Sequence, residues 1–97
     1  MYFLEKLFDI NYRISIHEGN AIRRLASESI KIIILPSNEV PILYKKEFLK
    51  LRKLLEDNIK DLNSPGVIPT NIKGIRNKTA TKYIKLLFDI EDSLRDE

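Results

Sequence analysis

The chain has 97 residues, of which 43% are hydrophobic and 32% are charged, and its formal net charge is +3. These proportions are typical of one soluble globular domain over residues 1–97 and exclude a disordered chain. No unbroken apolar run exceeds four residues. A membrane-spanning helix needs roughly 20, so we expect no membrane insertion.

The absence of cysteine excludes a disulfide framework and a thiolate metal site. We expect no metal, cofactor or small-molecule substrate, and a reducing, cytoplasmic location. The N-terminal stretch contains Glu5 and Asp9 and lacks a basic leader, so a signal peptide is not expected.

The charges are unevenly distributed along the chain. Residues 89–97 hold five acidic side chains and one basic one, a net charge of −4, whereas the other 88 residues have a net charge of +7. A basic body attracts polyanions, and an acidic end, which we expect to fray, can screen that attraction or bind a partner. The simpler interpretation is a well-solvated surface.

Helical spacing of apolar residues dominates the chain. The first stripe consists of Phe3, Leu7, Ile10 and Ile14, and we expect an ion pair between Asp9 and Arg13. Gly19 then predicts a left-handed helix stop, and Asn20 predicts the cap of a second helix that continues to Pro36. On its outer face we expect Arg24 to pair with Glu28.

The second half of the chain predicts two longer helices. Pro41 is expected in the first turn of a helix that continues to about Leu62, and the last helix runs from about Lys78 to Leu94. Between them, the long irregular stretch 63–77 contains isolated apolar residues, so we expect it to pack onto the helices. The fold class is therefore all-α: a compact antiparallel bundle of about four helices with one long packed loop before the last helix.

The second helix predicts a partner interface, because its apolar residues surround the helix instead of marking one face. These residues are Ile30, Ile32, Ile33, Ile34 and Leu35. Burial on all sides is explained equally well by a central position in a monomer or by a second chain, whether another copy or a permanent partner.

A second candidate surface is basic. Lysine and arginine gather around the start of the last helix, where Asn77 is expected to cap free amides that favour anions and Tyr83 offers a stacking face. The candidate anion or nucleic-acid contacts are Arg23, Arg24, Lys73, Arg76, Asn77, Lys78, Thr79, Lys82 and Lys85. A capped helix with solvated lysines is the alternative. The basic run 45–53 of the third helix fits a DNA-reading helix or any exposed helix equally well.

The only histidine, His17, follows Arg13 by four residues, a spacing that a helical nuclease could use. No second histidine is present to complete an acid/base pair, and the stretch "HEGN" also predicts a plain turn between two helices. No P-loop, G-x-S-x-G elbow or H-E-x-x-H motif occurs, so we do not expect an enzyme.

Several short motifs resemble a family of small uncharacterised bacterial all-helical proteins. They are the turn Gly19-Asn20 followed by Arg24-Leu25, Pro41 before a long charged helix, and the helix start Asn77-x-Thr79-Ala80. The resemblance implies an all-helical accessory protein, often carried by mobile or defence-related loci, and implies no reaction.

We therefore predict a non-enzymatic protein–protein interaction or regulatory subunit, oligomeric or bound to a partner, whose interface includes the isoleucine-rich helix and the loop before the last helix. The alternative is a nucleic-acid-binding module that uses the basic residues named above. A small RNase built on Arg13 and His17 is the third hypothesis.

Overall fold

The computed structural model describes residues 2–61 and 67–96, and it is all-helical over these ranges. The helices are α1 (Tyr2–Ile16), α2 (Ala21–Ser27), α3 (Ser29–Ile33), α4 (Ile42–Lys60) and α5 (Asn77–Arg95), with a short 3₁₀ turn, η1 (Ser37–Glu39), before α4. The molecule measures 39 × 26 × 21 Å. The predicted all-α class is confirmed, with five α-helices in place of about four.

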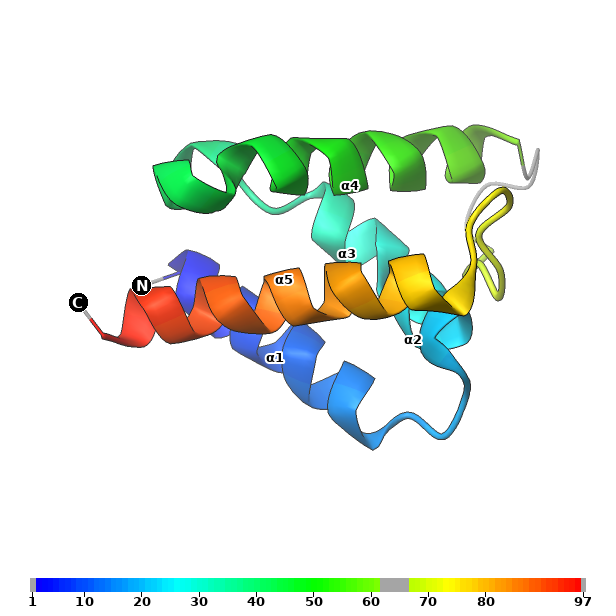
Figure 1. The fold of residues 1–97 in the computed structure, drawn as a ribbon, viewed down its shortest axis with the longest axis horizontal. Coiled ribbons are helices and arrows are strands. Elements are labelled where there is room, and N and C mark those ends of the chain that lie inside the picture. The colour runs from blue at the N-terminus through cyan, green and yellow to red at the C-terminus, as the bar shows by residue number, and fades with distance from the viewer. Residues whose placement is uncertain (1, 62–66, 97) are drawn as a thin grey trace.

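Helix α5 lies at the centre of the arrangement (Figure 1). It packs most extensively against α2 and α1, and α4 covers α3 and α5 from the other side. Both α1 and α4 run antiparallel to α5 (Figure 1). The stripe predicted in α1 is confirmed, because Phe3, Leu7, Ile10 and Ile14 are all buried. Their partners in the core include Phe48 of α4 and Leu87 of α5.

The predicted second helix is broken in two at Glu28, whose backbone (φ −104°, ψ 8°) ends α2 and precedes α3. The Ser27 hydroxyl donates to the carbonyl of Arg24, a local bond that competes with helix continuation. Apolar spacing did not reveal the break, because Leu25, Ala26, Ser29 and Ile32 stay on one buried face across it.

The loop before α5 packs on the helices only in part. Pro69 and Ile72 are buried, whereas Val67 and Ile68 are exposed, and residues 62–66 lie outside the described ranges. The buried Asn58 of α4 holds the loop through both ends of its side-chain amide. Its Nδ2 donates to Asn71 O (2.9 Å), and its Oδ1 accepts from Lys73 N (3.1 Å).

The helix ends differ from the prediction in detail. Pro41 is the N-cap residue before α4 instead of a first-turn residue. The acidic end of the chain is helical to Arg95, because Leu94 is 9% exposed and Glu91 is hydrogen-bonded to α1.

Replacing Asn58 with alanine should release the loop from α4. Because a buried amide that bonds the backbone twice is removed, we expect unfolding free energy to fall by about 1–3 kcal/mol. Trypsin should then cut more rapidly after Lys73, which lies in the loop. Asn38→Ala, at an exposed position on η1, is the control. Unchanged stability and unchanged cleavage in Asn58→Ala would contradict the role assigned to this side chain.

Candidate interaction surfaces

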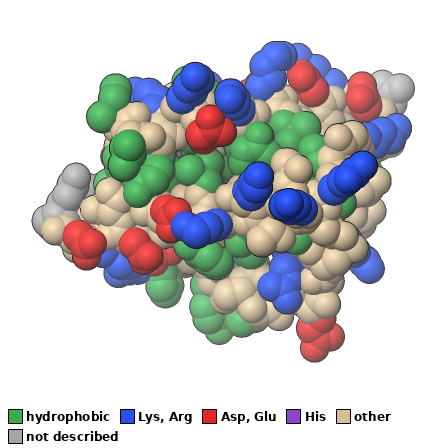
Figure 2. Space-filling model, in the orientation of Figure 1, with side chains coloured by type: hydrophobic (Ala, Val, Ile, Leu, Met, Phe, Trp, Pro, Cys, Tyr) green, Lys and Arg blue, Asp and Glu red, His purple; other side chains and the backbone are tan. Residues whose placement is uncertain are grey.

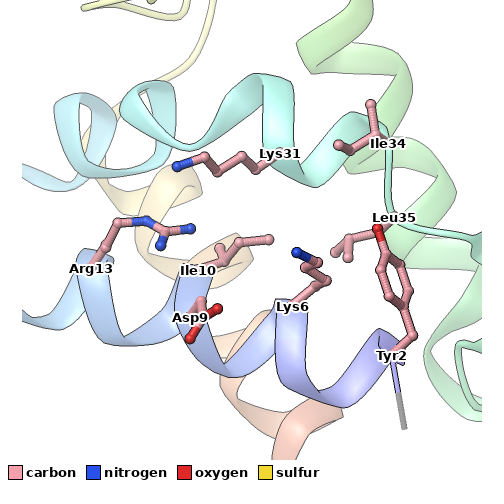
Figure 3. A pocket seen from close by; sticks show the side chains of 8 residues that line it. All are labelled: Tyr2, Lys6, Asp9, Ile10, Arg13, Lys31, Ile34 and Leu35. Carbon is pink, nitrogen blue, oxygen red and sulfur yellow. The ribbon is translucent and has the colours of Figure 1, made fainter.

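A hollow of about 260 Å³ lies between α1 and α3, and we call it the α1–α3 groove. Its apolar floor and walls come from Ile10, Leu35, Tyr2 and Ile34. Figure 3 shows basic side chains from both helices reaching into this space. They are Lys6, Arg13 and Lys31, and Asp9 is the one lining residue with a carboxylate.

Arg13 is held in place by Glu28, which lies at the break between α2 and α3. The Nε atom of Arg13 lies 2.9 Å from Glu28 Oε1, and the Glu28 side chain is 7% exposed. This pair replaces both predicted ion pairs, Asp9 with Arg13 and Arg24 with Glu28. A buried carboxylate needs a cationic partner, whereas an exposed pair along one helix gains little.

Lys6 and Lys31 are the cations of the groove that form no ion pair within residues 2–61 and 67–96. The Lys6 ammonium lies 5.3 Å from the centre of the Tyr2 ring, which is a cation–π distance. The groove thus combines an apolar floor with two lysines whose charges are not neutralised by a carboxylate within the described ranges.

Within this chain alone the isoleucine-rich segment is not buried on all sides, so a central position in a monomer does not explain its apolar residues. Ile32 and Leu35 belong to the chain's own core and Ile33 is half-buried, whereas Ile30 and Ile34 are 42% and 68% exposed. Helix α3 packs one side against α1 and α4, and its other side faces solvent. Of the predicted interface, Ile30 and Ile34 are therefore available to a partner.

The second surface forms where the starts of α2 and α5 meet. The amide of Ile22 donates to Asn77 Oδ1 (3.0 Å), which joins the first turns of these two helices. Five exposed basic residues of the predicted set on α2, α5 and the loop before α5 form no ion pair within the described ranges. We call them the basic end: Arg23, Lys73, Arg76, Lys78 and Lys82. Figure 2 shows lysine and arginine side chains over the same end of the molecule.

The other members of the predicted basic set have different roles. Arg24 Nε donates to the carbonyl of Gly19 (2.8 Å), and Lys85 pairs with Asp89 (2.8 Å). Asn77 is the first helical residue and not the cap, because its side chain is bonded to α2; Arg76 is the N-cap. Thr79 is half-buried beside Lys82 and Tyr83 in a shallow hollow.

The basic run of α4 is mostly paired along its own helix. Lys50 pairs with Glu47, Arg52 with Glu56 and Lys53 with Asp57, at distances of 3.2–3.6 Å. Such pairs are typical of an exposed helix surface, and they favour that interpretation over a DNA-reading helix.

His17 closes the turn between α1 and α2. Its Nδ1 accepts a hydrogen bond from the Gly19 amide (2.8 Å), and Asn20 Oδ1 accepts from Arg23 N (2.9 Å), so the predicted cap of the second helix is confirmed. Gly19 does not adopt the predicted left-handed conformation; of the glycines in the described ranges, Gly74 has a positive φ (84°). A Cβ at Gly19 would lie 2.7 Å from His17 Cε1, so close packing is what requires this glycine.

These bonds give no support to a nuclease built on Arg13 and His17, because each side chain is engaged elsewhere. Within residues 2–61 and 67–96, no group of three histidine or carboxylate side chains is placed to hold a metal ion. No described helix is long and apolar enough to cross a membrane.

No local sequence signal marks Tyr2, Lys6 and Lys31, because their role depends on the approach of α3 to α1. The exposure of Ile42 and Leu43 at the start of α4, 89% and 78%, was not predicted either. Their position could have indicated this exposure, because both follow Pro41 directly and lie outside the apolar stripe that begins at Tyr44.

No family model matches the chain, and no curated protein or solved structure shows significant similarity to it. The resemblance to small bacterial helical proteins therefore stays a prediction.

The contact between Lys85 and Asp89 gives a prediction about pH. The hydrogen bond and charge of Asp89 raise the pKa of Lys85 above its ordinary value of 10.5. The stability that this contact contributes is therefore complete below pH 10.5 and is lost as the pH rises through the higher folded-state pKa. An NMR titration of the Lys85 ammonium should show this elevation, and Asp89→Asn should lower the pKa toward 10.5. Equal pKa values in both proteins would contradict the assigned cause.

Proposed function

We propose that this chain is a non-enzymatic protein-binding module that docks its partner on the exposed side of α3 and the adjoining α1–α3 groove. The observation that carries the proposal is Ile34, which is 68% exposed and forms part of the groove wall. Ile30 lies one turn earlier on the same side of the helix, and Tyr2 (59% exposed) lies on the opposite wall. Together these residues form what we call the α3 docking surface.

The composition of this surface supports protein binding. Covering an exposed isoleucine removes apolar area from water and yields on the order of 1–2 kcal/mol per side chain. Protein interfaces commonly place such residues at the centre and charged residues at the rim. Here Lys6 and Lys31 flank the apolar residues, where they would steer and orient a partner without having to be fully desolvated.

An accessory or regulatory role fits a surface that combines exposed apolar side chains with flanking lysines. The short motifs around Gly19, Pro41 and Asn77 support placing it with bacterial proteins of mobile or defence-related loci. A reducing cytoplasm fits the absence of cysteine.

The test uses two exposed isoleucines of similar exposure. Ile34→Glu should reduce recovery of a stoichiometric partner from the native host at least tenfold, because a charge would be placed in the centre of the apolar contact. Ile16→Glu, at a 60% exposed position at the end of α1, should leave recovery unchanged. Affinity purification followed by mass spectrometry measures both. Equal recovery of a partner with the unaltered chain and with both variants would exclude docking at α3, and so would recovery of no partner at all.

The basic end favours a second candidate function, binding of nucleic acid. The bond between Ile22 and Asn77 brings Arg23 of α2 to the start of α5, where Arg76 and Lys78 are exposed. None of these three cations pairs with a carboxylate within the described part of the chain. Phosphate groups are the natural complement of such a cluster.

Replacing Arg23 and Arg76 with glutamine together should lower the affinity for a fluorescent single- or double-stranded oligonucleotide about tenfold or more. The slope of log K against log salt should become shallower by about 2, one for each phosphate contact removed. Lys45→Gln/Lys46→Gln on α4 is the matched control, with the same change of charge. Equal loss in both double variants would show unspecific attraction to a basic protein.

A further inference from the structure

The outer side of α5 carries a row of charged residues in which lysines occupy the first half and aspartates the second. Successive members are four, three, four, three and four residues apart, a spacing that keeps them on one line along a helix. We call this row the α5 charge stripe: Lys78, Lys82, Lys85, Asp89, Asp92 and Asp96.

The stripe faces solvent. Five of its members are exposed and Asp89 is half-buried. The buried residues of α5, among them Ala80, Leu87 and Leu94, lie on other sides of the helix. In Figure 2, blue side chains gather over the start of α5 and red side chains over its end, along the helix that faces the viewer in Figure 1.

The order of these charges opposes the helix dipole. Cations stabilise the C-terminal end of a helix and anions the N-terminal end, whereas α5 has lysines at its start and aspartates at its end. The one ion pair within the stripe, Lys85 with Asp89, has lysine before the acid, which is the weaker order at this spacing. The stability of α5 alone therefore does not explain the order of these charges. A binding partner with the complementary order of charges would explain it.

We propose that a second copy of this chain docks along the stripe with its α5 antiparallel, forming a two-fold symmetric dimer. The pattern is its own complement when it is reversed about Leu87. Lys78 then faces Asp96 of the second copy, Lys82 faces Asp92, and Lys85 faces Asp89, and symmetry forms each contact twice. The two helix dipoles are also antiparallel, which is their favourable arrangement.

Other occupants complement the stripe less well. A parallel second copy would place lysine on lysine and aspartate on aspartate. A nucleic acid would be attracted by the lysine half and repelled by the aspartate half. Lys78 and Lys82 also belong to the basic end, so the dimer and a bound nucleic acid would compete for them.

The dimer depends mainly on charge. Exposed ion pairs are individually weak and are screened by salt, so association should be weak and strongly salt-dependent. Leu86, 9% exposed, and the half-buried Phe88 flank the stripe and add a little apolar area. This surface is separate from the α3 docking surface, and the two proposals stand or fall independently.

Sedimentation equilibrium of the full chain at concentrations up to about 1 mM tests the dimer. We expect association in 50 mM NaCl and at least tenfold weaker association in 500 mM NaCl. Lys82→Asp and Asp92→Lys should each weaken association at least tenfold, because each creates two like-charge contacts. Lys46→Asp, an exposed position on α4, is the control and should have no effect.

The decisive measurement mixes the two single variants. Lys82→Asp and Asp92→Lys should form a heterodimer with each other, since both contacts are then of opposite charge, and the double variant Lys82→Asp/Asp92→Lys should dimerise again with itself. Circular dichroism confirms that each variant is folded. A monomer at every concentration in 50 mM NaCl would overturn the proposal. The proposal would also be overturned if the mixture, or the double variant, associated no better than the single variants do. That result is expected if these lysines bind nucleic acid instead.

Discussion

The ion pair between Arg13 and the buried Glu28 determines how the first half of this molecule is arranged. A carboxylate that is nearly excluded from water has to keep a cation beside it, so α1 and the junction of α2 with α3 are fixed relative to each other. The α1–α3 groove exists because α3 leaves this junction beside α1, so that Lys31 lines the same hollow as Lys6 and Arg13 (Figure 3). Removing the carboxylate would alter both the packing and the groove.

Much of the fold could be predicted from the sequence, because apolar periodicity reports which side of a helix is buried. The stripe of α1 is an example, as is the cap at Asn20. The break at Glu28 could not be predicted, because the buried residues on either side of it keep the spacing of one continuous helix. The exposure of Ile34 could not be predicted either, since periodicity shows that a residue is apolar and not whether a neighbouring helix reaches it.

The candidate sites were likewise predictable only in part. Residue types alone identified the basic end, and the bond from Ile22 to Asn77 brings the starts of α2 and α5 together there. Asn77 has the residue type of a cap, yet its side chain is bonded to Ile22 of another helix. The groove was not predicted because Lys6 and Lys31 are ordinary surface lysines until α3 is placed beside α1. Long-range contacts decide these roles, and a single sequence carries no local signal for them.

The bonds that join the first helices to the last one have a consequence for the order of folding. Asn11 of α1 donates to Leu87 O and Glu91 Oε1, and Ile22 of α2 is bonded to Asn77, so contacts across 55 to 80 residues hold the core together. On the ribosome, α1 and α2 emerge long before α5 does. Their apolar faces, including Phe3 and Leu25, then stay uncovered until residues 77–95 have been made. During synthesis, these exposed apolar faces are the part of the nascent chain most prone to aggregate.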